Sequence, residues 1–255
     1  MIESSRTAPH VLLIGDSCID EYIYGVVDRV SPEAPVPVLS FIEKRTKEGM
    51  ASNVLNNLHA LGFTVDPYLS PNQSLKTRYI DKRSNQQLLR VDDDRVNQPL
   101  KTRSMALSHY DAIVISDYNK GFIDNFTILD IIFRYKGPVF IDTKKKDMEK
   151  FESENVYIKI NSKEYDEAVS TSTNTIVTRG AKGASYANIH YPGIPAELSD
   201  VTGAGDTFLA ALCWGYHYLN NIEDAIKVAI HAASISVRHS GVYTLTEEDI
   251  NEITG

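Results

Sequence analysis

The stretch DVTGAGDTF, from Asp200 to Phe208, is the most informative part of this chain. Gly203 and Gly205 let backbone N–H groups approach an anion, because glycine has no Cβ and tolerates unusual φ/ψ angles. The apolar residues 207–219 predict a helix, whose N-terminus adds partial positive charge and unpaired donors. Asp206 lies at the N-terminus of this helix, where a carboxylate can take a proton from an attacking hydroxyl. The alternative is a glycine-rich turn in which Asp206 only caps the helix.

The whole nonapeptide resembles the signature of the ribokinase-like (PfkB) carbohydrate kinases. Three further stretches resemble the kinase domains that act on D-glycero-β-D-manno-heptose 7-phosphate, namely SPEAPVPV at 31–38, NQQLLRVD at 85–92 and SDYNKG at 116–121. The resemblance implies ATP-dependent phosphoryl transfer to a sugar hydroxyl, with ATP and Mg²⁺ as cofactors and a sugar phosphate as the acceptor. Asp206 would be the catalytic base, and the amides of Gly203, Ala204 and Gly205 would stabilise phosphate charge.

Composition limits the class of protein. A chain of 255 residues fits one α/β domain, taken here as 1–255. The formal net charge of −8 argues against a nucleic-acid partner, and no apolar run reaches membrane-spanning length. The first nine residues lack a signal-peptide core. Two cysteines, Cys18 and Cys213, indicate neither a disulfide framework nor a metal site, so we expect a reduced, cytoplasmic protein.

Short apolar runs predict the strands of a doubly wound, mostly parallel sheet. They occupy 11–15, 112–115, 139–141, 156–160 and 176–178, with helical patterns at 51–61, at 123–135 and from Thr207 onward. Ligands in such sheets bind beyond the carboxyl ends of the strands. Polar residues stand at these ends: Asp16, Ser116, Asp142, Asn161 and Thr178.

Two segments, about 21–47 and 75–93, alternate polar and apolar residues and predict exposed antiparallel strands. The family resemblance implies that they form a small β-sheet lid over the sugar site. Exposed sheet edges tend to be paired or covered, so we expect a homodimer through the lid, with apolar surface from Tyr22, Tyr24, Val36 and Val38. The links 63–74 and 165–174 look short for this family, and we expect no full helix in the second.

The ATP side of the predicted site begins with Asn161 and Glu164, which fit the family's NxxE motif. The resemblance implies that Glu164 acts on Mg²⁺ through bound water. The alternative is a helix cap by Asn161 with Glu164 as its capping-box partner, and both can hold together.

A second stretch resembles the family's nucleotide loop, with Thr178, Gly180 and Gly183 near the phosphates or ribose. The same letters also fit a simple hairpin. His231 stands where relatives place a residue near the adenine, with a helix-surface histidine as the alternative. The resemblance further implies a monovalent cation such as K⁺ close to the anion hole, beside Ser240-Gly241 and Thr244.

On the sugar side, Asp16 and Asp20 flank the end of the first strand, where carboxylates can accept hydrogen bonds from sugar hydroxyls. Asn53 matches a sugar-contacting asparagine that follows a pair of glycines in the family. Here only Gly49 remains of that pair, and Met50 takes the second place. This departure opens the alternative of a different sugar substrate.

An already phosphorylated sugar needs a cationic clamp. Lys76 and Arg78 lie two apart and would face the same way on a strand. With Arg90 and Lys120 they form the predicted clamp, although each one singly is an ordinary surface charge. Since the chain has no HxGH motif, we expect no nucleotidyltransferase activity. A non-catalytic sugar- or nucleotide-binding relative of a kinase is the alternative from another class.

Overall fold

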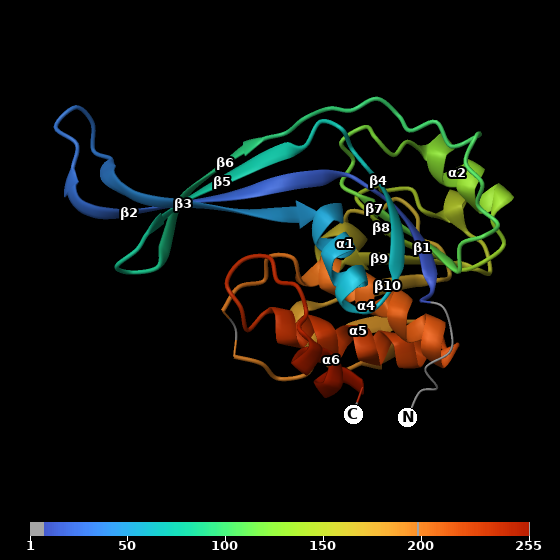
Figure 1. Ribbon diagram of the computed structural model, residues 1–255. Coiled ribbons are helices and arrows are strands. Elements are labelled where there is room, and N and C mark those ends of the chain that lie inside the picture. The colour runs from blue at the N-terminus through green and yellow to red at the C-terminus, as the bar shows by residue number, and fades with distance from the viewer. Residues whose placement is uncertain (1–7, 198, 255) are drawn as a thin grey trace.

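Short runs of branched apolar residues form the centre of an eight-stranded sheet in the computed structural model, which describes residues 8–197 and 199–254 (Figure 1). The central strands are β1 (His10–Gly15), β7 (Ala112–Asp117), β8 (Val139–Thr143), β9 (Val156–Asn161) and β10 (Thr175–Thr178). The strand order is β12-β11-β10-β9-β8-β7-β1-β4, and every pair from β10 to β4 is parallel. The predicted mostly parallel sheet is confirmed, and the carboxyl ends of these strands share one edge.

The strands at the two edges of this sheet were not identified in the sequence analysis. At one margin lies β4 (Thr64–Leu69), inside the segment that looked like a bare link. It contains Pro67, which lacks an N–H donor and is tolerated because β4 is an edge strand. At the other margin β11 (Ala184–Tyr186) and β12 (Ile189–Tyr191) pair antiparallel.

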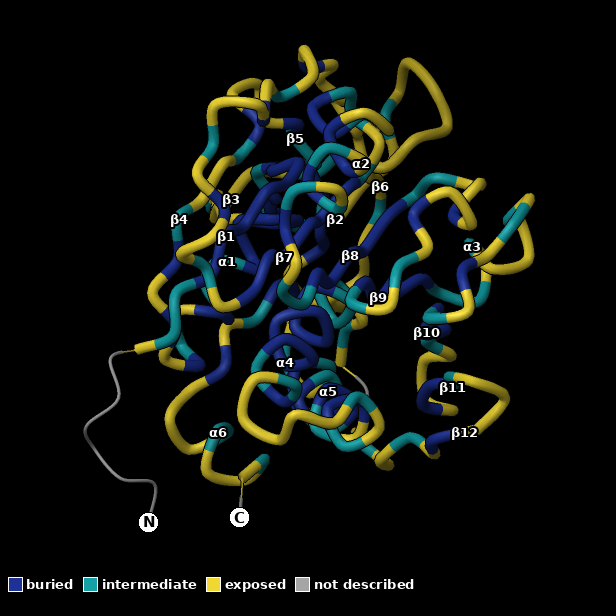
Figure 2. The backbone as a smooth tube through the Cα atoms, turned by 90° about the vertical axis from the view of Figure 1, so that its right-hand side faces the viewer, coloured by how far each residue is buried: buried dark blue, intermediate teal, exposed yellow. Residues whose placement is uncertain are grey.

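Side chains of one central strand point alternately into two cores. Val11 and Leu13 of β1 pack toward α1 (Ala51–Ala60), α4 (Ala204–Leu219) and α5 (Ile222–Ser236), with α6 (Glu247–Thr254) against α5. Leu12 and Ile14 face the other layer, which contains α2 (Asn125–Arg134), η1 (Glu149–Phe151) and irregular segments. Figure 2 shows the buried central strands between these layers. The helix layer on the α2 side is therefore thin.

The described helices also include α3 (Ser162–Asp166) and the single turn η2 (Gly180–Lys182). Because α3 ends at Asp166, no full helix fills 165–174, as expected from the shortness of that link. In the part of the chain that the structure describes, no helix has the length and apolar content needed to cross a bilayer.

A second sheet of four strands extends from the main body as a long arm (Figure 1). It consists of β2 (Ser17–Val30), β3 (Pro37–Met50), β5 (Ser74–Asp81) and β6 (Gln86–Asp93), in the order β3-β2-β5-β6. The predicted small β-sheet is present, but it is not wholly antiparallel, because β2 and β5 run parallel. The reason is continuity: β1 runs directly into β2, β4 leads into β5, and β1 and β4 are already parallel.

Met50 joins the lid to α1 in a strained backbone conformation. Its φ is 58° and its ψ is −132°, a region that side chains with a Cβ rarely adopt. The residue is only 3% exposed, and the next amide, that of Ala51, donates to the carbonyl of Asp16 at 3.0 Å. The backbone thus requires a glycine-like geometry where the family resemblance expects glycine, and Met50 holds it at a cost of about 1–3 kcal/mol.

We expect Met50→Gly to be more stable than Met50→Ala. Both variants remove the buried side chain, but only glycine relieves the strain at positive φ, which is worth about 1–2 kcal/mol. At an ordinary helical position glycine is instead about 0.5–1 kcal/mol less stable than alanine. Urea unfolding of the two variants measures the difference, with Ala60→Gly as the control for an unstrained position. An alanine variant equal to or better than the glycine variant would show that the backbone at residue 50 is relaxed.

Candidate active site

The GAGD turn forms the N-terminus of α4. Gly203 caps the helix at φ 80°, and a Cβ there would lie 2.7 Å from the side-chain nitrogen of Asn53, so both conformation and space call for glycine. Asp206 sits in the first turn and is 3% exposed. The helix N-terminus places partial positive charge beside this buried carboxylate.

Two side chains from other segments hold the Asp206 carboxylate. The Tyr118 hydroxyl donates to Oδ1 at 2.8 Å, and Asn53 Nδ2 donates to Oδ2 at 3.3 Å. Burial raises the pKa of Asp206 to about 6, although the hydrogen bond from Tyr118 acts in the opposite direction. A carboxyl with such a pKa is ionised at neutral pH and is a stronger base than an ordinary aspartate.

The sequence did not predict two lysines that lie beside Asp206 in the structure. Lys159 on β9 is buried, and its Nζ donates to Asp142 Oδ2 at 2.7 Å. A Cβ on Gly205 would lie 2.7 Å from that Nζ, so the ammonium rests against the first turn of α4. Lys144 lies with its Nζ 4.9 Å from the centre of the Tyr118 ring. The available signal was a lysine inside the otherwise apolar strand VYIKIN.

These lysines control the charge of Asp142. Burial alone would raise the pKa of this carboxyl, but Lys159 and Lys144 outweigh burial and hold its pKa below the usual value. Its second oxygen, Oδ1, is buried without a hydrogen-bond partner. The site therefore combines the ammonium groups of Lys144 and Lys159 with one oxygen of Asp142 that can still accept a hydrogen bond.

Two adjoining cavities open at this edge of the sheet. A polar cavity of about 460 Å³ contains Asp206, Tyr118, Asp142, Lys144 and Lys159. A more apolar cavity of about 500 Å³ is lined by residues such as Ile194, Phe208 and Ile230. The two share Thr178, Gly180, Val201 and Gly205. An apolar chamber beside a cationic one suits a molecule with a flat aromatic part and an anionic tail.

The NxxE pair forms the capping box that was one of its two interpretations. Asn161 Oδ1 accepts from the Glu164 amide at 3.0 Å, and Glu164 Oε2 accepts from the Asn161 amide at 2.8 Å. Lys144 contacts the other oxygen of Glu164. Both carboxylate oxygens are thus engaged, so direct metal ligation would require Lys144 to move, whereas contact through water would not.

The predicted nucleotide loop lies at the cavities. Thr178 and Gly180 line both, and Gly183 lines the apolar one. The hairpin interpretation of this loop also holds, because β10 and β11 pair antiparallel across it. His231 is not among the residues lining either cavity, and its Nε2 lies 3.3 Å from Glu252 Oε1 on α6.

On the predicted sugar side, Asp16 is fully buried at the junction of β1 and β2. Its Oδ2 accepts from the amides of Tyr118 at 2.9 Å and Lys120 at 3.1 Å, while Oδ1 is buried without a partner. Burial raises the pKa of Asp16, because it disfavours the charged form of this carboxyl. A hydrogen bond from a bound ligand to Oδ1 would stabilise that charged form. Gly49 lies against Asp20, since a Cβ there would be 2.1 Å from Asp20 Oδ2.

Three of the four basic residues of the predicted clamp are paired with carboxylates, although Arg78 and Arg90 lie opposite one another on β5 and β6. Arg78 is buried and pairs with Asp20, so its charge is compensated within the protein. Lys76 points toward the site, with its Nζ 5.5 Å from the centre of the Tyr118 ring. Arg90 pairs with Asp92 along its own exposed strand, and the Lys120 ammonium lies against Asp94. Of the four, only Lys76 combines proximity to Tyr118 with no ion pair among the described residues.

Solved structures share this fold at low sequence identity. A ribokinase from Thermotoga maritima has a TM-score of 0.71 at 20% identity and covers 95% of this chain and 98% of its own. Phosphofructokinase-2 from Escherichia coli, solved in complex with potassium, also has a TM-score of 0.71, at 13% identity, covering 97% and 98%. The chain therefore has a ribokinase-like fold.

Sequence comparisons identify a family and individual relatives that this chain resembles. A model of the pfkB family of carbohydrate kinases matches residues 148–249. The relative named "Bifunctional protein HldE" from Hyphomonas neptunium is 32% identical over 94% of this chain, and its namesake from Nitratiruptor is 30% identical over 96%. This chain spans 62% and 64% of the length of those two relatives. The chain is therefore similar to the pfkB family of carbohydrate kinases over residues 148–249, and to the two relatives over most of its own length.

We expect Asp206→Asn to stabilise the protein in a pH-dependent way. Folding raises the pKa of this carboxyl from 3.8 to about 6, so the wild type loses stability as pH rises through that window. At about 1.4 kcal/mol per pKa unit, the gain of the variant over the wild type approaches about 3 kcal/mol above pH 6. Urea unfolding at pH 4, 5, 6 and 8 tests this. A difference independent of pH would mean that Asp206 ionises as readily in the folded protein as in the unfolded chain.

Proposed function

We propose that this chain transfers a phosphoryl group from ATP to a hydroxyl of D-glycero-D-manno-heptose 7-phosphate, giving the 1,7-bisphosphate. The observation that carries the proposal is the buried Asp206 carboxylate at the N-terminus of α4, beside a cationic cavity and an apolar one. The relatives named HldE support the acceptor, as do the stretches 31–38, 85–92 and 116–121. The last of these contains Tyr118, which contacts Asp206.

Each residue then has a role in the transfer. The adenine and ribose occupy the apolar cavity, and the phosphates extend past Gly203, Ala204 and Gly205 toward Lys159 and Lys144. The acceptor hydroxyl approaches Asp206, which takes its proton as the bond to phosphorus forms. Tyr118 and Asn53 keep the carboxylate oriented.

The donors present also suit a magnesium ion. Asp142 Oδ1 is buried without a hydrogen bond, 3.9 Å from Lys144 Nζ. Glu164 contacts the same lysine, which lines the polar cavity together with Asp142. Mg²⁺ prefers oxygen ligands and retains several waters, so Glu164 would act through water and Asp142 would accept from that hydration shell. When bound, the ion offsets the negative charge of the phosphates. The protein's own residues still bind the acceptor and remove its proton.

On the acceptor side, Asp16 Oδ1 is available for a sugar hydroxyl, and Asp20 and Gly49 shape the adjoining wall. Lys76 is the best-placed cation for the acceptor's own phosphate. Arg78 supports this wall through Asp20, and Arg90 and Lys120 would have to leave Asp92 and Asp94 before they could contribute. Met50 at the start of α1 favours one second candidate, a kinase of the same type with a different sugar phosphate acceptor.

The first test measures ADP release with heptose 7-phosphate and with a panel of free sugars and sugar phosphates. We expect turnover with heptose 7-phosphate, and a loss of about 10²–10⁴-fold in Asp206→Asn because the general base is gone. Asp224→Asn, a first-turn aspartate of the neighbouring helix α5, is the matched control and should keep full activity. Turnover only with another acceptor would replace the substrate, and a fully active Asp206→Asn would remove this residue from the mechanism.

A lysine ammonium group lies where the monovalent cation was expected. Lys47 Nζ donates to the carbonyls of Ser240 at 3.0 Å and Val242 at 2.9 Å, while the Gly241 amide donates to Asp200 Oδ2 at 2.9 Å. Backbone carbonyls are the groups that bind K⁺ in proteins. We propose that the Lys47 ammonium substitutes for K⁺ in this chain.

If Lys47 substitutes for K⁺, the rate of ADP release should be the same in potassium chloride and in choline chloride. Lys47→Ala should be slower, and K⁺ should restore part of its activity because the vacated carbonyls can then bind the ion. Lys44→Ala, on the same strand β3, serves as the control. Activation of the wild type by K⁺, with no K⁺ rescue of Lys47→Ala, would contradict the substitution.

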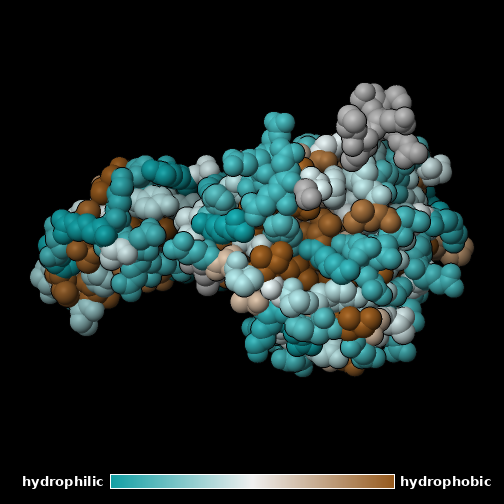
Figure 3. Space-filling view, turned by 90° about the horizontal axis from the view of Figure 1, so that it is seen from below, coloured by the Kyte–Doolittle hydropathy of each residue, from teal (hydrophilic) through white to brown (hydrophobic). Residues whose placement is uncertain are grey.

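We propose a homodimer through the lid, which is the partner expected from the sequence. Apolar side chains are exposed along the arm, and Figure 3 shows hydrophobic patches at its far end. Tyr22 does not contribute to them, because it is buried against Gly241. The exposed apolar residues of the arm are Val30, Val36, Phe41, Ile42, Leu89 and Val91.

Light scattering should report a dimer for the wild type and a monomer for Phe41→Asp, because a charge at the centre of an apolar interface is strongly unfavourable. Phe41 is 66% exposed, and Phe133 on α2 is 79% exposed. Phe133→Asp is therefore the matched control and should remain dimeric. A monomeric wild type, or dissociation caused by Phe133→Asp alone, would rule out the lid as the interface.

A further inference from the structure

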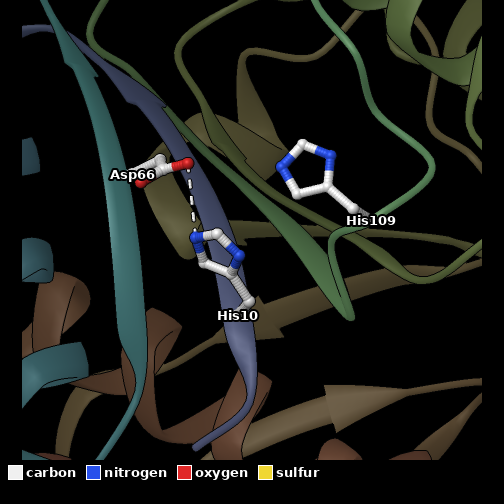
Figure 4. Close-up of side chains that lie close together, drawn as sticks. All are labelled: His10, Asp66 and His109. Carbon is white, nitrogen blue, oxygen red and sulfur yellow. Dashed lines mark ion pairs between the residues drawn. The ribbon is translucent and has the colours of Figure 1, made fainter.

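Three potential metal ligands lie together at the amino end of the main sheet, away from the cavities (Figure 4). They are His10 on β1, Asp66 on β4 and His109 in the loop before β7, and their ligand atoms all lie within 4.8 Å of one another. His10 Nε2 is 3.2 Å from Asp66 Oδ2. Among residues 8–197 and 199–254, this is the one group of three such side chains found so close together.

The strand register explains why two of the ligands meet. His10 and Leu12 are two apart on β1 and therefore face the same side of the sheet. Asp66 is paired with Leu12 in the parallel ladder, so its side chain faces that side too. The two side chains then converge at the sheet edge, where an ion can enter from solvent.

The loop that brings His109 is fixed to the same strand. The His10 amide donates to Asp111 Oδ2 at 2.7 Å, and the Asp111 amide donates to the His10 carbonyl at 2.7 Å. The Tyr135 hydroxyl on the α2 side holds the Tyr110 carbonyl at 2.9 Å. His109 is thus anchored through its neighbours, and in Figure 4 one of its ring nitrogens faces the His10–Asp66 pair.

The outer contacts resemble those that support metal ligands in general. The Tyr110 hydroxyl donates to Asp66 Oδ2 at 2.8 Å, which orients the carboxylate. His10 Nε2 is buried but makes no hydrogen bond of good geometry, so this nitrogen lacks a partner apart from the ion pair. A buried nitrogen without a hydrogen bond is costly unless something binds to it.

We propose that His10, Asp66 and His109 bind one divalent transition-metal ion of the Zn²⁺ class, with water completing its coordination. Two imidazoles and one carboxylate favour such ions over Mg²⁺ or Ca²⁺, which prefer oxygen ligands. Ligand atoms around tetrahedral zinc lie about 3.4 Å apart, so the exposed His109 ring would move inward by about 1 Å. The ion would join the edge strand β4 and the loop before β7 to β1.

This site is separate from the phosphoryl-transfer chemistry. His10 begins β1 and Asp16 follows its end, which places them about 20 Å apart at ~3.3 Å per strand residue. The proposal therefore stands whatever the acceptor sugar proves to be. The competing interpretation is a metal-free ion pair between His10 and Asp66, packed against the rings of His109 and Tyr110.

The test uses the full, untagged chain after treatment with a chelator. Calorimetric titration with zinc chloride should give one tight site, and titration with Co²⁺ should give the visible absorption bands of an ion bound by imidazole. His109→Ala should weaken zinc binding by more than about 100-fold, since even loss of an outer contact typically costs 10–100-fold. Tyr110→Phe, which leaves all three ligands in place, should fall within that 10–100-fold range.

His190→Ala removes an exposed histidine on β12, away from the three ligands, and is the matched control. It should bind zinc like the wild type. Thermal unfolding without metal checks that His109→Ala is folded, and ADP release checks that its phosphoryl transfer is intact. The proposal fails if the wild type shows no site of one-to-one stoichiometry, or if His109→Ala and His190→Ala bind zinc equally well.

Discussion

The buried carboxylate of Asp206 is the constraint on which the arrangement of this molecule depends. It is held by Tyr118 from the end of β7 and by Asn53 from α1, so one charged group ties together three segments that are distant in sequence. Keeping a charge away from water is unfavourable unless helix, hydrogen bonds and nearby cations compensate for it. This compensation explains three features: Gly203 and Gly205 at the start of α4, the lysine on β9, and the fit of α1 against α4.

Much of the site could be predicted because its signals are local. The start of α4 follows from glycine geometry and helix capping, and the polar residues Asp16, Asp142 and Asn161 follow from the shared edge of parallel strands. Lys159 could not be placed this way, because its pairing with Asp142 depends on the register between β8 and β9. The position of His231 likewise depends on the packing of α5 against α6, where Glu252 meets it.

The predicted clamp illustrates a second limit of sequence analysis. Charges that looked free in the sequence are largely paired in the structure: Arg78 with Asp20, Arg90 with Asp92 and Lys120 with Asp94. A period-two pattern identifies which side chains share a face, but it does not show which of them are already neutralised by a neighbour. Asp16 and Asp142 are more informative, because each keeps a buried carboxylate oxygen without a hydrogen bond, and buried polar atoms rarely lack one.

The continuity of β1 with β2, and of β4 with β5, has a mechanical consequence. Only Asp16 separates β1 from β2, so the arm is an extension of the core sheet and not an appendage on a flexible tether. β2 extends from that point as a lever of 14 residues, about 45 Å at ~3.3 Å per residue. Tilting the arm by a few degrees displaces its tip by several ångströms while the fulcrum stays almost still. The carboxylate of Asp16, for which we propose a sugar-binding role, is therefore located where the lever moves least.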